Sequence, residues 1–312
     1  MKKSGILLVN IGSPKEPTKA ETKKYLAKFL GDPRVIKTPR ALWLPILHGI
    51  ILNTRPAKSA KLYQSVWRED GGSPLMIYAR NQQENLQKLH PDKIVEIATS
   101  YSEPSIPDTL DKMLAQGVND LTVIPMYPQY SGTTVGSVYD DVTRYFRKSD
   151  KIITVKFVHS FYENEQYIAH FVKRIKDRLE KENFDALLFS YHGIPVSYVE
   201  DGDTYPTECD ETTKLIMAGV GDFPFYQTYQ SKFGPSEWLT PATDATLKTL
   251  PKQGVKRILV IAPSFVADCL ETLEELEVEN KGYFMENGGE YFGYLPPFNE
   301  DMELAEIFSD LI

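Results

Sequence analysis

Residues 186–192 read ALLFSYH, an apolar run that turns polar at Ser190 and ends on a histidine, shortly before Gly193 and Pro195. A short apolar run that stops at a glycine and a proline is typical of a buried strand. His192 would then lie at the carboxyl end of that strand. It either ends the strand for structural reasons or presents a chemically active group.

Similar apolar runs recur along the chain and alternate with segments of helical period. The strand-like runs cover residues 6–10, 94–98, 121–127, 152–158, 186–191, 225–230 and 257–263, and helical patterns cover 19–30, 81–89, 106–117, 167–181 and 244–254. Strands that alternate with helices predict a mostly parallel sheet with helices on both faces. The predicted fold class is α/β.

The two halves of the chain resemble each other in the way their strands end. ILLVNIGSP and LTVIPMYPQYS in the first half echo ALLFSYHGIP and ILVIAPSFVAD in the second. We expect two similar α/β domains, over residues 1–148 and 149–312, each with a mostly parallel sheet. Ligands of open parallel sheets bind outside the carboxyl ends of the strands. Two facing domains would place the residues that follow the strands around one cleft.

Composition excludes several classes of protein. The net charge of -8 over 312 residues lacks the basic footprint of nucleic-acid binding. The two cysteines, Cys209 and Cys269, form neither a disulfide framework nor a zinc motif, which fits a reducing compartment. The longest nearly apolar run, residues 41–52, contains Pro45 and is shorter than the ~20 residues of a membrane span. We expect a cytoplasmic protein.

The usual ligands of α/β folds leave a sequence signature that this chain lacks. A lone Gly12 follows the first strand, and the sequence contains neither GxGxxG nor GxxxxGK[ST]. It also lacks the GxSxG elbow of a hydrolase. Dehydrogenase, kinase and hydrolase functions are therefore disfavoured.

His192 is the first candidate for chemistry. A histidine at a strand end can simply bond to a backbone carbonyl, but it can also exchange a proton near neutral pH or bind a metal in its neutral form. Its position before a glycine, at the open edge of a sheet, favours an active role.

Glu271 is the second candidate, in the segment VADCLETLEELEVEN over residues 266–280. Asp268 and Glu271 have the spacing of a helix capping box. Glu271, Glu275 and Glu279 drift by only ~40° per step on an α-helix and form one acidic stripe, which is usually a solvated face. An active role competes with both structural ones.

An active role for His192 and Glu271 is better supported when the two residues are considered together. His192 and Glu271 both follow predicted strands of the second half, so one parallel sheet would present them at the same edge. An imidazole and a carboxylate suit a borderline divalent ion such as Fe²⁺. They equally suit the removal of protons from a weakly acidic N–H group. The acidic stripe could conduct cations toward them.

The presumed cleft is rich in aromatic residues, which are more often core than ligand-binding. Residues 41–52, ALWLPILHGIIL, form either a buried helix or an exposed lip. Such a lip could grip a flat apolar ligand and touch a membrane surface.

At this point the motifs resemble those of the ferrochelatases, which insert Fe²⁺ into a porphyrin to make heme. Blocks similar to those of the family occur in family order from about residue 5 to about residue 298: LLVNIGSP, KFLGDPR, LYQSVWREDGGSPL, PMYPQYSGTT, FSYHGIP, GDTYP, QSKFG, EWLTP and FVADCLETLEEL. FSYHGIP and FVADCLETLEEL carry the most specific matches. The resemblance implies a lyase of heme and porphyrin biosynthesis built of two Rossmann-like domains, each with a mostly parallel four-stranded sheet flanked by helices.

The resemblance also implies roles for single residues. His192 and Glu271 fall on the iron and catalytic positions, and Glu275 and Glu279 fall on an acidic path for the metal. The remaining matches are implied porphyrin contacts: Ile11, Arg55, Ser73, Tyr101, Tyr130 and Trp238. The porphyrin would be clamped and bent, and His192 would act as the base for its two N–H protons with help from Glu271. Sequence does not decide whether His192 first binds iron or takes a proton.

Two departures from the family pattern bear on the substrate. Ser100 stands where many members carry an arginine, which puts one ring contact in doubt. Ile11 stands where members that use coproporphyrin have a tyrosine, so protoporphyrin IX is the expected substrate. Some members hold a [2Fe-2S] cluster on four cysteines, whereas this chain has two. We therefore expect no iron-sulfur cluster and no permanently bound cofactor.

The expected partners are a porphyrin and ferrous iron as substrates. Contact with a membrane surface and a monomeric state both stay open. The competing functions are a ferrochelatase for coproporphyrin III, a chelatase that inserts cobalt into a related tetrapyrrole, and a porphyrin or heme carrier without catalysis.

Overall fold

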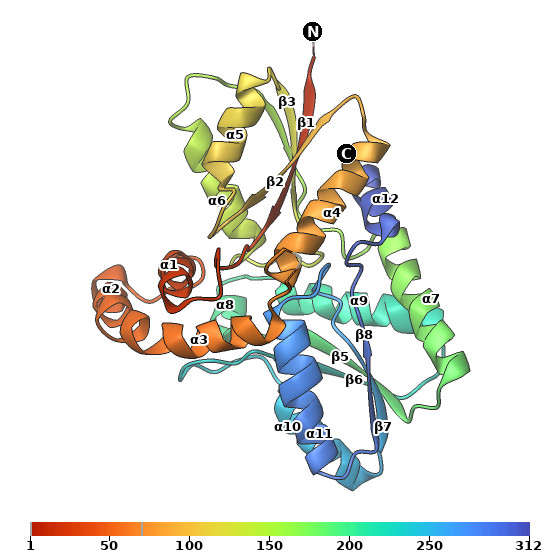
Figure 1. The fold of residues 1–312 in the computed structure, drawn as a ribbon. Helices are drawn as coiled ribbons and strands as arrows, with labels where there is room; N and C mark the ends of the chain where they lie inside the picture. Colours follow the sequence, from red (N-terminus) through yellow and green to blue (C-terminus); the bar gives the residue numbers. More distant parts are fainter. Residues whose placement is uncertain (1, 70) are drawn as a thin grey trace. The chain divides into compact units, whose positions relative to one another are not determined.

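The computed structural model describes residues 2–69 and 71–312 of the chain. The chain divides into two units, of which the first covers residues 1–160 and 300–312 and the second covers 161–299. Figure 1 shows the fold coloured along the chain.

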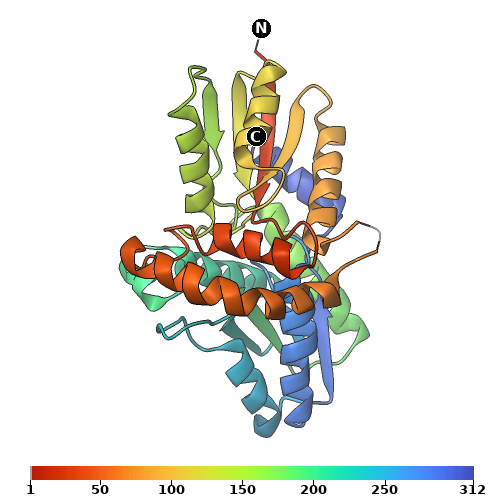
Figure 2. The same cartoon turned by 60° about the vertical axis from the view of Figure 1, so that its left-hand side comes forward.

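The first unit is built on a four-stranded parallel sheet. Its strands are β1 (Ser4–Asn10), β2 (Ile94–Thr99), β3 (Asp120–Pro125) and β4 (Thr154–Phe157). Their order is β2-β1-β3-β4, and every neighbouring pair is parallel. Figure 2 shows these strands side by side with helices along them.

The helices of the first unit surround this sheet and extend from it. They are α1 (Lys19–Phe29), α2 (Arg40–Ile46), the π-helical turn η1 (Leu47–Ile51), α3 (Leu52–Val66), α4 (Pro74–Leu89), α5 (Ile106–Ala115), α6 (Val135–Phe146) and α12 (Met302–Asp310).

The second unit repeats the sheet of the first. Its strands are β5 (Ala186–His192), β6 (Phe225–Gln230), β7 (Arg257–Ile261) and β8 (Tyr291–Leu295), in the order β6-β5-β7-β8 and all parallel. Its helices are α7 (Glu165–Lys181), α8 (Val196–Glu200), α9 (Tyr205–Val220), α10 (Thr243–Thr249), the 3₁₀ turn η2 (Leu250–Gln253), the π-helix η3 (Glu271–Asn280) and α11 (Lys281–Glu286).

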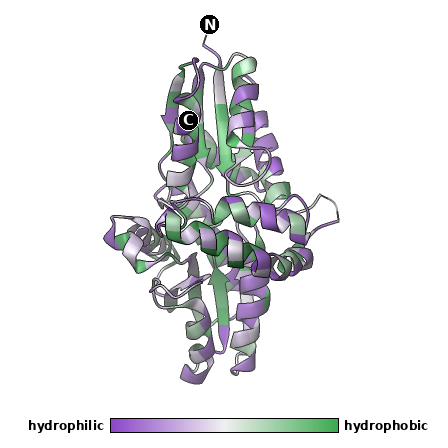
Figure 3. Cartoon of the chain, turned by 90° about the vertical axis from the view of Figure 1, so that its left-hand side faces the viewer, coloured by the Kyte–Doolittle hydropathy of each residue, from purple (hydrophilic) through white to green (hydrophobic). Residues whose placement is uncertain are grey.

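The two sheets share one strand order, since the second strand in sequence lies outside the first in both. This confirms the predicted class of two α/β units with parallel four-stranded sheets. The central strands are almost wholly buried, as in Ala186–Tyr191. Parallel strands covered on both faces read as continuous apolar runs, which is why they were visible in the sequence. Figure 3 shows the strands coloured as hydrophobic and the helices as mixed.

The observed boundary between the units differs from the expected one after residue 148. β4 pairs with β3, so the first unit has to extend past this strand. The helix α12 also belongs to the first unit, where it packs on α4. Asn85 Nδ2 donates to the carbonyl of Glu300 at 2.9 Å, and His90 Nε2 lies 2.9 Å from Ser309 Oγ. The second unit is therefore a contiguous insertion in the first.

The apolar segment 41–52 forms α2 and η1, and one face of it is exposed. Trp43 and Leu47 face the interior, where Trp43 Nε1 donates to the carbonyl of Leu30 at 2.7 Å. Leu42, Ile46 and Ile50, four residues apart, are 63%, 41% and 58% exposed. This segment is therefore an exposed lip and not a buried helix. Within residues 2–69 and 71–312, every helix is too short or too polar to span a bilayer.

Candidate active site

His192 is the last residue of the central strand β5, and its side chain is half-buried. Its Nδ1 lies 2.7 Å from the carbonyl oxygen of Gly193. Because a carbonyl oxygen can only accept, Nδ1 carries the proton in this contact. In the neutral ring the lone pair is then on Nε2, where it can accept a proton or bind a metal. The structural and the active interpretation of this histidine are thus compatible.

Gly193 is surrounded closely enough to fix the backbone next to the imidazole. A Cβ built on it would lie 2.9 Å from the carbonyl oxygen of Gln230 and 3.1 Å from a ring carbon of Trp238. Trp238 is buried, and no acceptor for its indole Nε1 is found among the described residues. The structure therefore places Trp238 beside the residue that follows His192.

The strand β6 connects His192 with the acidic segment. In the sheet Gln230 is the register partner of His192, and its carbonyl oxygen accepts from Gly193 N at 2.8 Å. The side-chain Nε2 of Gln230 donates to the carbonyl oxygen of Glu271 at 3.0 Å. The backbones that carry the two candidate residues are thus joined through one glutamine.

Glu271 begins a π-helix, η3, and not the α-helix that the sequence predicts. The expected capping box does not form. Asp268 is buried, and its carboxylate accepts from Thr272 Oγ1, Tyr294 OH and Asn299 Nδ2. These bonds fix the loop before Glu271 and leave the Glu271 carboxylate out of a capping role.

Glu275 lies one turn further and is electrostatically linked to both candidates. Ser231 donates to its carboxylate from N at 2.7 Å and from Oγ at 2.6 Å. Burial raises the pKa of Glu275, while the hydrogen bonds from Ser231 and the charge of His192 lower it and the charge of Glu271 raises it. His192 and Glu271 thus both act electrostatically on Glu275, and we refer to these three residues as the cluster.

Glu279 continues this line toward solvent. It is exposed, and its carboxylate accepts from Tyr283 OH at 2.7 Å, whereas Glu271 and Glu275 are half-buried. The predicted stripe is thus present, with exposure that increases outward. In the part of the chain that the structure describes, no group of three or more His, Cys, Asp and Glu side chains has metal-binding geometry.

In the first unit, Ile11 and Tyr101 lie next to each other beyond the carboxyl ends of β1 and β2. Tyr101 N donates to the carbonyl of Ile11 at 3.3 Å. Tyr101 is buried against Phe29, and its hydroxyl donates to Asp32 at 2.8 Å. Burial and the charge of Asp32 raise its pKa. Tyr101 therefore supports this region from inside, and its hydroxyl is engaged.

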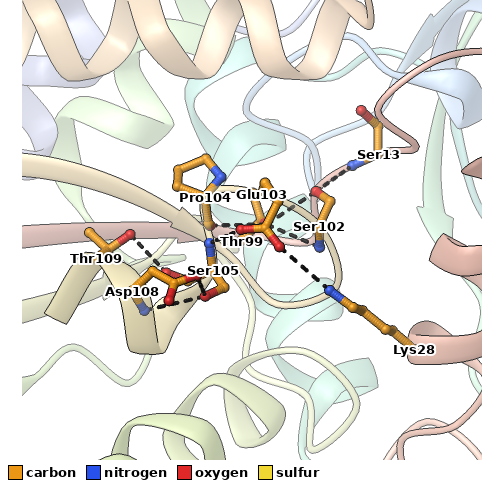
Figure 4. A network of polar contacts seen from close by, with 9 residues as sticks. All are labelled: Ser13, Lys28, Thr99, Ser102, Glu103, Pro104, Ser105, Asp108 and Thr109. Atoms are coloured by element: carbon orange, nitrogen blue, oxygen red, sulfur yellow. Dashed lines mark hydrogen bonds and ion pairs between the residues drawn. The ribbon is translucent and has the colours of Figure 1, made fainter. Parts of the chain in front are cut away.

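A network of small polar residues holds the loops after β1 and β2 together (Figure 4). Ser102 Oγ accepts from Ser13 N and donates to Thr99 Oγ1, both at 3.1 Å. Gly12 has a φ of +83°, and a Cβ on it would lie 2.1 Å from Ser102 Oγ. Only glycine fits this approach.

Ser73 is buried at the start of α4, where it precedes Pro74. It lines a pocket of about 760 Å³ in the first unit, together with Ser13, Trp67 and Gln83. The pocket is also lined by Lys112 and Glu96, which form an ion pair with 2.7 Å between Lys112 Nζ and Glu96 Oε1.

The other two predicted porphyrin contacts lie in different parts of the first unit. Arg55 is exposed on α3. Tyr130 follows β3 and stacks on His159, which follows β4, with 4.2 Å between the ring centroids. The structure thus groups Ile11 with Tyr101 but leaves Ser73, Arg55 and Tyr130 on separate elements.

Sequence reasoning did not identify Gln230 and Ser231, although QSKFG was among the matched blocks. A polar pair directly after a predicted strand was the available signal, because strand ends form the binding edge of a parallel sheet. The structure adds the contacts of this pair, since Gln230 donates to the carbonyl of Glu271 and Ser231 donates to the carboxylate of Glu275.

Comparison with known proteins gives a consistent result. The family model described as Ferrochelatase matches residues 3–312. A protein of Enterococcus faecalis named coproporphyrin III ferrochelatase is 60% identical, with 100% of this chain and 99% of that protein covered. A protein of the same name from Lactococcus lactis subsp. cremoris is 46% identical, with 100% and 96% covered. A ferrochelatase of Pectobacterium atrosepticum is 45% identical, with 99% and 98% covered.

Among solved structures, SirB from Bacillus subtilis with Fe³⁺ is similar to this chain. The TM-score is 0.57 at 12% sequence identity, and the match covers 98% of this chain and 93% of that one. At this identity the likeness shows a shared fold, which agrees with the two repeated sheets.

Proposed function

The chain belongs to the ferrochelatase family, which inserts ferrous iron into a porphyrin, and from this premise we propose that its porphyrin is coproporphyrin III. Two of the relatives above carry coproporphyrin III in their names, and one of them is 60% identical to this chain. This proposal reverses the expectation of protoporphyrin IX.

The charge of the lip segment supports a substrate with more carboxylates. Residues 33–68, which include α2, η1 and α3, contain no Asp or Glu. They contain the basic residues Arg34, Lys37, Arg40, Arg55, Lys58, Lys61 and Arg68. Arg34 is paired with the carboxylate of Asp140. The segment still carries an excess of positive charge in a chain of net charge -8, and such an excess favours anionic ligands. Coproporphyrin III carries four carboxylates and protoporphyrin IX carries two.

The earlier expectation of protoporphyrin IX rested on Ile11 alone. Ile11 packs at the edge of the apolar cluster that contains Tyr25, Leu26 and Tyr101. Its side chain has no polar atom with which to distinguish two carboxylates from four. A single apolar contact typically discriminates by only ~1–3 kcal/mol. The identity of residue 11 is therefore weaker evidence about the substrate than the charge of residues 33–68.

The cluster of His192, Glu271 and Glu275 supports the chemistry. As iron enters, two pyrrole N–H protons must leave. Nε2 of His192, which has one lone pair, is the group assigned to accept one of them, and the Glu271 carboxylate accepts the other. Glu271 assists at the metal, and Glu275 and Glu279 form the path by which iron arrives. Bending of the porphyrin, which exposes its nitrogens, costs ~1–5 kcal/mol drawn from binding of the rest of the ring.

Steady-state iron insertion under anaerobic conditions tests the substrate. We expect kcat/KM to be at least about tenfold higher for coproporphyrin III than for protoporphyrin IX, which corresponds to about 1.4 kcal/mol. The preference should shrink at high salt, because exposed charges are screened. An equal or opposite preference would contradict the proposal.

A charge variant with a matched control distinguishes the effect of a positive charge in the lip segment from the effect of the protein's overall charge. Arg55→Gln should lower kcat/KM for coproporphyrin III more than for protoporphyrin IX. Lys173→Gln, which removes the same charge from an exposed pair on α7, should change neither. Tight porphyrin binding without any metal insertion would instead indicate a carrier, and preference for cobalt over iron would indicate the other chelatase activity.

A further inference from the structure

Gln230, on β6, contacts both elements that carry the cluster, which are β5 with His192 and η3 with Glu271 and Glu275. It is 2% exposed and ends β6. Its backbone oxygen accepts from Gly193 N, next to His192, at 2.8 Å. Its side-chain Nε2 donates to the Glu271 carbonyl at 3.0 Å and to Glu275 Oε2 at 3.3 Å. One side chain therefore contacts the acidic segment at two points.

The orientation of the Gln230 amide is determined by its neighbours. Nε2 faces a carbonyl oxygen and a carboxylate oxygen, both of which can only accept. Oε1 accepts from the buried hydroxyl of Ser190 at 2.7 Å. Ser190 in turn contacts Thr243 Oγ1 at 3.0 Å. A reversed amide would place two acceptors against its oxygen, so only one orientation satisfies the site.

Ser231 completes the contact with an unusual backbone. Its φ is +66°, which costs a residue with a Cβ about 1–2 kcal/mol. In this conformation both its N and its Oγ donate to the Glu275 carboxylate. Strained backbone of this kind persists where surrounding structure requires it, and it is frequent at functional sites.

We propose that Gln230 and Ser231 are positioning residues that hold Glu271 and Glu275 in place relative to His192 for metal delivery. The proposal rests on the roles assigned above to His192 and Glu271. Neither residue needs to touch the porphyrin or the metal. Partners of this kind orient the groups that do, and their loss typically reduces metal affinity or activity by about 10–100-fold.

The main test is the Gln230→Leu variant, which keeps the volume and removes both donors. We expect kcat/KM for Fe²⁺ to fall by about 10–100-fold through a higher KM for Fe²⁺. The KM for the porphyrin should stay within about twofold of the parent. A merely structural role would lower kcat/KM for both substrates alike, or the amount of folded protein, and would not raise the KM for Fe²⁺ alone.

The matched control is Gln227→Leu, the same substitution three residues earlier on the same strand. Gln227 Nε2 donates to Asp210 and to Tyr229 OH, outside the cluster. We expect parent-like kinetics from this variant. Equal KM values for Fe²⁺ in Gln230→Leu and Gln227→Leu would overturn the proposal.

Ser231→Ala provides a second and milder test, because it removes one donor to Glu275 and leaves the backbone N. We expect a rise in KM for Fe²⁺ near the lower end of the same range, about tenfold. Should Gln230→Leu fail to fold, Ser231→Ala decides in its place, and a parent-like KM for Fe²⁺ would overturn the proposal.

Failure of this inference and failure of the proposed function give different results. If the parent protein inserts no iron into either porphyrin, or if His192→Ala and Glu271→Gln are fully active, the proposed function fails. If the parent is active and those two variants are impaired while Gln230→Leu and Ser231→Ala match the parent, only the positioning role fails. Co²⁺ absorption of the metal-loaded protein provides a readout without turnover, and its visible bands should weaken in Gln230→Leu.

Discussion

Substitution of Gly193 by alanine would place a methyl group where the structure has no room for it. The new Cβ would lie 2.9 Å from the carbonyl oxygen of Gln230, and ordinary van der Waals contact begins at 3.4 Å. The strands would have to separate by about 0.5 Å, the difference between these distances. The carbonyl cannot simply move away, because the same oxygen accepts from Gly193 N at 2.8 Å.

The expected cost follows from these contacts. Overpacking typically costs about 1–3 kcal/mol, and loss of the hydrogen bond adds about 0.5–1.5 kcal/mol. Alanine recovers about 0.4–1 kcal/mol because it restricts the unfolded chain. We therefore expect Gly193→Ala to lower the free energy of unfolding by about 0.5–4 kcal/mol. A shift of the His192 backbone by half an ångström should also reduce kcat about tenfold, since 1 Å can cost on the order of 10².

Urea unfolding and steady-state iron insertion measure the two effects. The control is Gly282→Ala in α11, where a Cβ would meet nothing within 4 Å. A helix-interior glycine replaced by alanine gains about 0.5–1 kcal/mol, so this variant should be slightly more stable and fully active. If Gly193→Ala matched the parent in stability and rate, the close packing around His192 would have no functional meaning.

Three further outcomes are expected. His192→Ala should lower kcat by a factor of about 10²–10⁴ and leave the porphyrin affinity within about twofold of the parent. Iron-insertion assays measure kcat, and titration of porphyrin fluorescence measures the affinity. Burial, with the charges of Arg174 and Lys173, lowers the pKa of His170 from 6.5 to about 3. Because the pKa of His170 is depressed in the folded state, the neutral imidazole contributes stability above pH 6.5, and this contribution is lost as the pH falls toward 3. The urea midpoint of His170→Phe should therefore depend less on pH over that range than the midpoint of the parent protein. The exposed apolar face of the lip should bind anionic vesicles, and joint replacement of Leu42, Ile46 and Ile50 by serine should reduce cosedimentation about 10²-fold, whereas unchanged binding would exclude this face.

The sequence predicted those parts of the fold that depend on local pattern. β5 and β7 were visible because buried parallel strands are continuously apolar. β8, which reads YFGYL, was not identified, since a glycine interrupts the run. Gly293 is needed there because a Cβ would lie 2.8 Å from the ring of Phe184. That contact is made by a residue more than a hundred positions away, and no local pattern shows it.

The sequence suggested candidate residues for the site but not their geometry. His192 and Glu271 could be placed at one sheet edge because both follow strands. The π-helical form of residues 271–280 could not be predicted, since the side-chain pattern does not separate i→i+5 from i→i+4 bonding. Tertiary contacts accompany it, such as the bonds from Tyr294 and Asn299 to Asp268. The role of Gln230 likewise appears only once β6 lies beside β5.

The return of α12 to the first unit has a consequence for synthesis of the chain. Domains fold in general as they emerge from the ribosome, the N-terminal one first. Here residues 161–299 are complete before residues 300–312 have been translated. Leu304, Ile307 and Phe308, which are fully buried in the first unit, follow residues 161–299 in the chain. The first unit can therefore close its core only after the whole of the second unit has been synthesised.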